Sequence, residues 1–264
     1  MPTRLVLLVI VIASIVSPQI RAESTDCATP VLMIADGRIT QSSFSQGATY
    51  WYAIYALAGH SYSVEFEPPA DNYPNATRVQ FSILGLFGPT DSLQACRGTS
   101  GVSVTQNSGY APVILKNGYG AGRRVSFTAQ SAGLHLISAT NQGGAGNYTF
   151  RAVDTTMVNV LWSTCGGFDN EWMFQNISDM PITGVLTVYD FSNHALTAAQ
   201  TSIPPGAGVV RYSHNFDLNL PRNSAGYAIF SPNGPPNSIV AISYMVNGAL
   251  TVIAPARFES AVPH

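Results

Sequence analysis

The sequence predicts an all-β protein with two tandem β-sandwich domains behind an N-terminal signal peptide. Apolar and polar residues alternate with a period of two through most of the chain, and Gly, Pro and Asn interrupt the alternation at short intervals. Between residues 30 and 260 no window shows a sustained apolar stripe at helical spacing. Short strands with turn signals every 8 to 12 residues or so are typical of sandwiches and barrels.

Residues 1–22 have the pattern of a secretory signal peptide. Arg4 precedes an apolar run over residues 5–16, then come Ser17 and Pro18, and small Ala22 marks the expected cleavage site. A membrane anchor needs about 20 apolar residues, and this run is shorter. We therefore expect secretion to the periplasm, the cell surface or the exterior, with no membrane span in the mature chain.

The predicted first domain covers residues 23–154. The segment 49–57 alternates regularly, so that Tyr52 and Ile54 share one face and Trp51 and Tyr55 share the other. Further strands are expected at 61–67, 79–87, 125–130, 134–140 and 148–153.

The predicted second domain covers residues 157–258, and residues 259–264 are expected to be a frayed tail. Its strands are expected at 157–163, 171–178, 182–191, 196–203, 209–215, 226–231 and 237–245. About seven strands in about 100 residues is the size of one immunoglobulin-like or jelly-roll-like sandwich.

The composition excludes several classes of function. The chain has 264 residues, of which 46% are hydrophobic and 10% are charged, and its net charge is −2. The 12 Lys and Arg residues form no run longer than Arg123-Arg124, whereas a nucleic-acid partner requires a basic patch. The low charge also limits the number of candidate acids and bases, so that we expect neither an enzyme nor a cofactor.

Three cysteines, Cys27, Cys96 and Cys165, follow the signal peptide. In an oxidising compartment an odd number leaves one thiol unpaired beside one bridge, or all three unpaired. We favour a Cys27–Cys96 bridge within the first domain, where closing the loop would contribute about 4 kcal/mol. No CxxC spacing or His-rich cluster indicates a metal site.

The first half resembles the bacterial pre-peptidase C-terminal domain over about residues 34–153. The matching positions are Trp51, Tyr52, Ile54, Ala58, Gly59, Gly133, Tyr148 and Phe150. Residues 48–50 depart from the acidic pattern of that family, which weakens any expectation of calcium binding. The resemblance implies a β-sandwich that accompanies other activities, with no active site to transfer.

The second half resembles an immunoglobulin-like repeat of secreted and surface bacterial proteins. The matching positions are Asn176, Pro181, Thr183, Gly184, Leu186, Tyr189, Asp190, Pro204, Pro205 and Gly206. This resemblance likewise implies an extracellular module without an active site.

Few residues are candidates for chemistry. Residues 117–122 are rich in Gly, but a strand follows them rather than the helix that a phosphate loop needs, so a hairpin is expected. Asp169 and Glu171 share a strand face and could bind a cation or act as acid and base, although a solvated loop edge is the simpler interpretation.

No G-x-S-x-G string occurs, and the spacing of the histidines does not mark a catalytic base. Four of the five histidines lie within the two predicted domains, namely His60, His135, His194 and His214. The alternation around His135 predicts that it lies on the outer face, between core residues Leu134 and Leu136. A secreted hydrolase remains as an alternative.

The aromatic residues Trp51 and Tyr55 give the most specific binding hypothesis. Rings standing on the outer face of a sheet can bind a carbohydrate or anchor a peptide or protein, although a loop or the second domain could also cover them. The function that we expect is a secreted, non-catalytic accessory, adhesive or structural protein of the bacterial cell envelope or exterior. The expected partners are extracellular proteins or polysaccharides.

Overall fold

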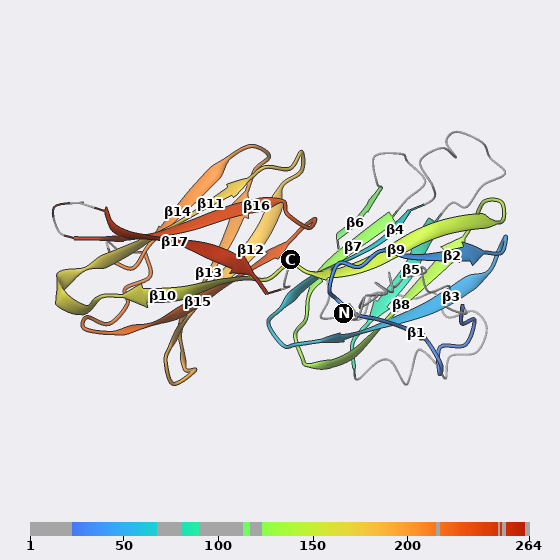
Figure 1. The fold of residues 1–264 in the computed structure, drawn as a ribbon, viewed down its shortest axis with the longest axis horizontal. Helices are drawn as coiled ribbons and strands as arrows, with labels where there is room; N and C mark the ends of the chain where they lie inside the picture. Colours follow the sequence, from blue (N-terminus) through green and yellow to red (C-terminus); the bar gives the residue numbers. More distant parts are fainter. Residues whose placement is uncertain are drawn as a thin grey trace, which may run out of the picture.

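The computed structural model describes residues 23–67, 81–89, 113–116, 123–214, 217–247, 249 and 252–261. In these ranges the chain is nearly all β-strand, with a single short 3-10 turn at Cys165–Gly167 and no α-helix. The all-β class and its sandwich architecture are therefore confirmed. Figure 1 shows the strands gathered into two halves, with β1 to β9 on one side and β10 to β17 on the other. The predicted signal peptide, Cys96 and residues 117–122 lie outside the described ranges.

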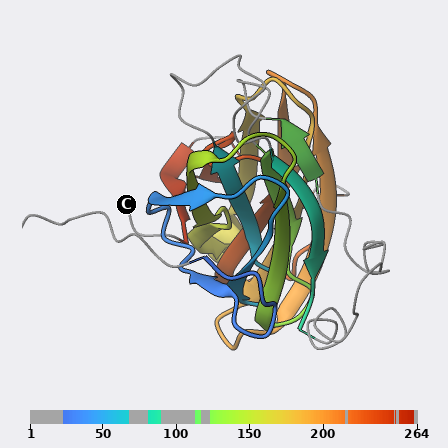
Figure 2. The same ribbon diagram turned by 90° about the vertical axis from the view of Figure 1, so that its right-hand side faces the viewer.

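The first half, residues 23–154, contains two sheets. One has the strand order β1-β3-β8-β5 and the other β2-β9-β4-β7-β6. The strands are β1 (Val31–Met33), β2 (Thr40–Phe44), β3 (Thr49–Ala56), β4 (Ser61–Glu67), β5 (Phe81–Phe87), β6 (Val113–Lys116), β7 (Arg123–Thr128), β8 (Gly133–Asn141) and β9 (Gly146–Asp154). The short strands β1, β2 and β6 were not predicted. Figure 2 views this half along the long axis of the molecule.

An aromatic core fills the space between these two sheets. Tyr52 and Ile54 of β3 are buried in it, as the alternation predicts. Tyr52 packs edge-on against Phe66, with ring centroids 4.8 Å apart, and its hydroxyl is bonded to that of Tyr148. Burial raises the pKa of Tyr52, because an ionised phenol would lose its hydration.

The second half, from residue 157 onward, contains one continuous sheet of eight strands in the order β13-β12-β15-β10-β17-β16-β11-β14. The strands are β10 (Met157–Ser163), β11 (Asp169–Asn176), β12 (Ile182–Asp190), β13 (Ala195–Ile203), β14 (Gly208–Tyr212), β15 (Ala225–Asn233), β16 (Ile239–Val246) and β17 (Val252–Ser260). Strand β17 was not predicted, and it continues two residues into the segment expected to be a tail.

The eight-stranded sheet folds back on itself around a core of large side chains. Trp162, Trp172 and Phe174 are fully buried in this core, and Phe174 stacks on Phe230 with ring centroids 4.1 Å apart. Arg211 of β14 holds the two ends of the sheet together. Its guanidinium donates to the hydroxyl of Thr201 on β13, at 2.8 and 3.1 Å.

The two halves meet through a polar junction. Strand β15 and the residues that follow it lie against the outer face of the five-stranded sheet, where Ser126 Oγ donates to the carbonyl of Gly234 at 3.0 Å. Ser231 Oγ of β15 donates in turn to the carbonyl of Gly59 at 2.6 Å. Ser63 and Ser126 are fully buried in consequence. The polar face of the five-stranded sheet, which the alternation predicts to be exposed to solvent, is therefore buried against the second half.

The prediction for His135 was wrong. Its side chain is buried in the core of the first half, stacked on Phe127 with ring centroids 5.5 Å apart, while Leu134 and Leu136 lie on the outer face of the sheet. Burial lowers the pKa of His135, and the hydrogen bond to the Gly133 carbonyl acts in the opposite direction. Alternation shows which residues of a strand share a face, but it does not show which face packs against the core. Both faces of β8 carry apolar residues, so the sequence pattern did not distinguish them.

Candidate functional site

The predicted binding residues Trp51 and Tyr55 lie on the outer face of the four-stranded sheet. In the register of that sheet Trp51 is opposite Ser138 and Tyr55 is opposite Leu134. The Trp51 ring is half-buried against Phe87, with centroids 5.8 Å apart, whereas Tyr55 is 68% exposed. The two residues therefore share a face, as predicted, but only Tyr55 presents most of its ring to solvent.

This surface continues beyond the two predicted residues. Leu32 of β1 is exposed beside β3, while Phe87 and Leu136 are buried in a small apolar cluster on the same side of the sheet. We name the surface formed by Leu32, Trp51, Tyr55 and Leu134 the aromatic face. The outward position of Trp51 and Tyr55 could be predicted because Tyr52 and Ile54 mark the inner face. The place of Leu32 on the same surface could be found only from the pairing of β1 with β3.

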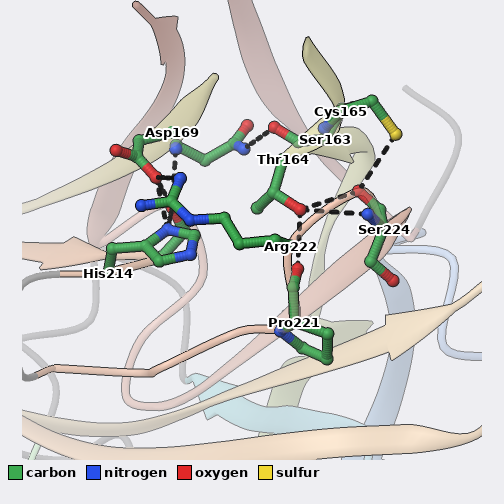
Figure 3. A network of polar contacts seen from close by, with 10 residues as sticks. Ser163, Thr164, Cys165, Asp169, His214, Pro221, Arg222 and Ser224 are labelled. Carbon is green, nitrogen blue, oxygen red and sulfur yellow. Dashed lines mark hydrogen bonds and ion pairs between the residues drawn. The ribbon is translucent and has the colours of Figure 1, made fainter. Parts of the chain in front are cut away.

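A network of polar contacts in the second half connects Asp169, Ser213, His214 and Arg222 (Figure 3). The carboxylate of Asp169 accepts a hydrogen bond from Arg222 at 3.0 Å and contacts Nδ1 of His214 closely. Ser213 Oγ lies 3.0 Å from the same Nδ1 and 3.3 Å from the Asp169 carboxylate. A histidine, a serine and an aspartate thus come together from β11 and the loop after β14.

The geometry of this cluster differs from that of a hydrolytic triad. In a triad one ring nitrogen of the histidine binds the carboxylate and the other binds the nucleophile. Here Nδ1 of His214 faces both groups, and Nε2 is buried without a hydrogen-bond partner among the described residues. Ser213 is fully buried, and its hydroxyl accepts the backbone N–H of Asn170 at 2.9 Å. These contacts join β11 to the loop after β14.

A second set of contacts in Figure 3 fixes the turn that carries Cys165. Thr164 Oγ1 donates to the carbonyl of Pro221 at 2.7 Å, and the N–H of Ser224 donates to Thr164 Oγ1 at 3.1 Å. Cys165 is a free, exposed cysteine whose Sγ lies 3.7 Å from the carbonyl of Ser224. Because Cys96 lies outside the described residues, the Cys27–Cys96 bridge stays a prediction.

Asp169 and Glu171, the two carboxylates that could bind a cation or form a solvated loop edge, both lie on β11. Asp169 already forms an ion pair with Arg222 and contacts His214, and Glu171 is the only other carboxylate of β11. Among the residues that the structure describes, no group of three His, Cys, Asp or Glu side chains has the arrangement of a metal site.

Two further histidines are paired with carboxylates. His60 Nδ1 lies 2.8 Å from Asp154 next to the junction, a pairing across 94 residues that no spacing motif indicates. His194 Nδ1 lies 3.3 Å from Asp190, whose carboxylate also accepts the N–H groups of Ser192 and His194. The backbone hydrogen bond from His194 is the main cause that lowers the pKa of Asp190.

A small cavity of about 50 Å³ lies at the junction, between Asp154, Thr155, Pro232 and Ser238. Ligand pockets for organic molecules are several times larger, so this cavity has room only for water-sized groups.

Comparison with known proteins gives no family. No protein-family model matches the chain, and no curated protein matches it. A glycosyl hydrolase family 2 member from Bacteroides cellulosilyticus DSM 14838 has 8% sequence identity and a TM-score of 0.20, with 82% of this chain and 29% of that chain covered. The full extracellular region of zebrafish Gpr126/Adgrg6 has 8% identity and a TM-score of 0.21, with 90% and 31% covered. This chain spans less than one third of either protein, and likenesses of this size carry no functional argument.

Proposed function

We propose that the chain is a secreted, non-catalytic accessory, adhesive or structural protein of the bacterial cell envelope or exterior, built from two sandwich domains. The observation that carries this proposal is that four histidines have structural contacts. His60 and His214 are bound to carboxylates that join distant segments, His194 closes a turn, and His135 is part of a core. These four side chains, which are the best candidates for a catalytic base, stabilise the fold.

Secretion is part of the proposal. The described residues include no helix that is long and apolar enough to cross a membrane. Secretion itself rests on the N-terminal sequence, and N-terminal sequencing of the protein recovered outside the cytoplasm tests it. A mature chain that begins after Ala22 is expected, and one that begins at Met1 would contradict secretion through a cleaved signal.

The proposed binding surface is the aromatic face. An exposed Tyr beside a half-buried Trp and an exposed Leu offers a flat contact area with little side-chain entropy to lose. Retention of the protein on insoluble cell-envelope polysaccharide and on envelope protein fractions tests this role. Tyr55→Ala should reduce retention about tenfold or more if the face binds, whereas Val160→Ala, an exposed position in the second half, should leave it unchanged. Equal retention of both variants would exclude the aromatic face.

Hydrolysis is the second candidate, and it rests on the proximity of Ser213, His214 and Asp169. A panel of ester, peptide and glycoside substrates tests it, together with a fluorophosphonate probe for reactive serine. We expect no turnover and no labelling, because Ser213 is buried and already accepts a backbone hydrogen bond. Labelling that disappears in Ser213→Ala would establish a hydrolase instead.

A further inference from the structure

One side of the eight-stranded sheet exposes apolar residues where alternation normally places polar ones. Strands β14, β11, β16 and β17 are neighbours there. Trp172, Phe174 and Ala241 point into the core from this sheet. On the opposite surface Met173 is 41% exposed and Val240 is 51% exposed.

The strand register arranges this outer surface in rows. One row runs from Tyr212 on β14 through Glu171 and Tyr244 to Pro255 on β17. The next row runs from Val210 through Met173 and Ile242 to Arg257. We name these two rows the β11–β16 face. Its centre is formed by Met173, Ile242 and Tyr244, so it is apolar and aromatic.

Two opposite charges flank this centre. Glu171 is in the first row on β11, and Arg257 is in the second row two strands away on β17. Among the described residues neither forms an ion pair within its own chain. The midpoint between Glu171 and Arg257 lies over β16, between Tyr244 and Ile242. The acid and the base therefore lie on opposite sides of the apolar centre, at equal distances from it in the strand register.

We propose that the β11–β16 face is a self-association surface for a second copy of this chain. In a two-fold symmetric dimer each residue meets its counterpart reciprocally. A two-fold axis that lies in the plane of the face, passes between Tyr244 and Ile242 and is perpendicular to the line from Glu171 to Arg257 places Glu171 of each copy opposite Arg257 of the other. The apolar centres then cover one another, and both charges are paired.

The charge pattern favours a second copy over an unrelated partner. A face with one acid and one base on opposite sides of an apolar centre is complementary to itself and carries no net charge to attract a charged partner. The two rows form a small surface compared with stable interfaces, which bury at least about 1,000 Å², so the dimer is weak and reversible. This face lies in the other half from Trp51 and Tyr55, so the inference is independent of the proposed function.

Sedimentation equilibrium of the mature chain over a wide concentration range tests self-association. We expect a monomer–dimer equilibrium that Met173→Lys removes, because the lysine would place an unpaired charge at the centre of the contact. Val160→Lys, an exposed apolar position on β10, is the matched control and should leave the equilibrium unchanged. A monomer at every concentration would overturn the proposal, as would equal association of both variants.

Reversal of the charge at position 171 or 257 gives a second test. Because the two variants are also mixed, a loss of association caused by misfolding can be distinguished from charge repulsion. Glu171→Lys alone and Arg257→Glu alone should each raise the dimer dissociation constant about tenfold or more, because each places like charges together. An equimolar mixture of the two variants should associate again, since Lys at position 171 then meets Glu at position 257 of the other copy. A mixture that associates no better than either variant alone would contradict the arrangement.

Discussion

Two buried asparagines, Asn141 in the first half of the molecule and Asn159 in the second, differ in their hydrogen bonding. In the first half Asn141 is fully buried, its Nδ2 donates to the carbonyl of Gly144 at 2.7 Å, and its Oδ1 accepts the N–H of Gly143 at 3.0 Å. In the second half Asn159 is fully buried too, but neither its Nδ2 nor its Oδ1 has a hydrogen-bond partner among the described residues. A buried amide without partners costs about 1–3 kcal/mol. The second half must offset this cost elsewhere.

The two halves also differ in how their sheets are connected. The first half has two separate sheets that are held face to face by an aromatic core, whereas β10 pairs with β17 to join both sides of the second half into one sheet. Arg211 then bridges the remaining edge between β14 and β13. Both halves therefore have a buried apolar core, and the second half is in addition closed around its circumference by hydrogen bonds.

The largest loss of stability in the second half is expected from Gly226→Ala. A Cβ at this position would overlap the carbonyl oxygen of Tyr189 on the neighbouring strand, so the β12–β15 pairing must shift. We expect the free energy of unfolding to fall by about 4 kcal/mol or more, measured by urea denaturation. The control is Gly208→Ala, whose Cβ would meet the carbonyl of Phe174 at an ordinary 3.5 Å. Equal losses in both variants would show that strand crowding does not limit this sheet.

The two buried asparagines provide a direct test of the opening comparison. Asn141→Leu should lower the free energy of unfolding by about 3 kcal/mol, because it leaves the carbonyl of Gly144 and the N–H of Gly143 without their partner. Asn159→Leu should be neutral or should raise it by about 1 kcal/mol, because it removes an amide without partners. Both changes are measured by thermal and urea unfolding. A large loss in Asn159→Leu would mean that the amide is hydrogen-bonded in solution.

The closure of the eight-stranded sheet is tested by Arg211→Ala. The change removes the bonds to Thr201 and the ion pair with Asp217 at 3.1 Å, and we expect a loss of about 2 kcal/mol in urea denaturation. Arg38→Ala in the first half is the matched control, because Arg38 pairs with Asp36 at 3.6 Å while 79% exposed, and its loss should stay below about 0.5 kcal/mol. If Arg211→Ala costs no more than Arg38→Ala, the edge is closed without this side chain.

Alkaline pH should weaken the first half before the second. Burial raises the pKa of Tyr62 from 10.0 to about 12, so the folded form binds a proton that the unfolded form has lost between these values. Stability from this group is complete below pH 10 and falls by about 1.4 kcal/mol per pH unit up to about pH 12. The fluorescence of Trp51 reports the first half in a Trp162→Phe/Trp172→Phe background. Tyr62→Phe should make the decline shallower, and an unchanged slope would exclude Tyr62 as its source.

Much of the fold could be predicted from local pattern. The regular alternation of residues 49–57 predicts the inward position of Tyr52 and Ile54 and the outward position of Trp51 and Tyr55, and the structure has both. The strands β1 and β6 are short, with three and four residues, so they contain too little of the period to be recognised. Strand β17 includes Pro255 and Arg257 among its apolar residues, which obscures its alternation.

The site could be predicted less well, because its contacts are long-range. His60 and Asp154 are 94 residues apart, and Asp169 meets Arg222 across 53 residues, so no spacing rule relates the partners. The sequence by itself determined the all-β class, most of the strands and the two faces of each strand, because side-chain direction alternates along any extended chain. Only the tertiary structure decided which faces are covered. His135 is buried in the core of the first half, and the face of the first half that carries Ser63 and Ser126 is buried against the second half. Burial depends on what packs against a strand, and that is a property of the assembled sheets.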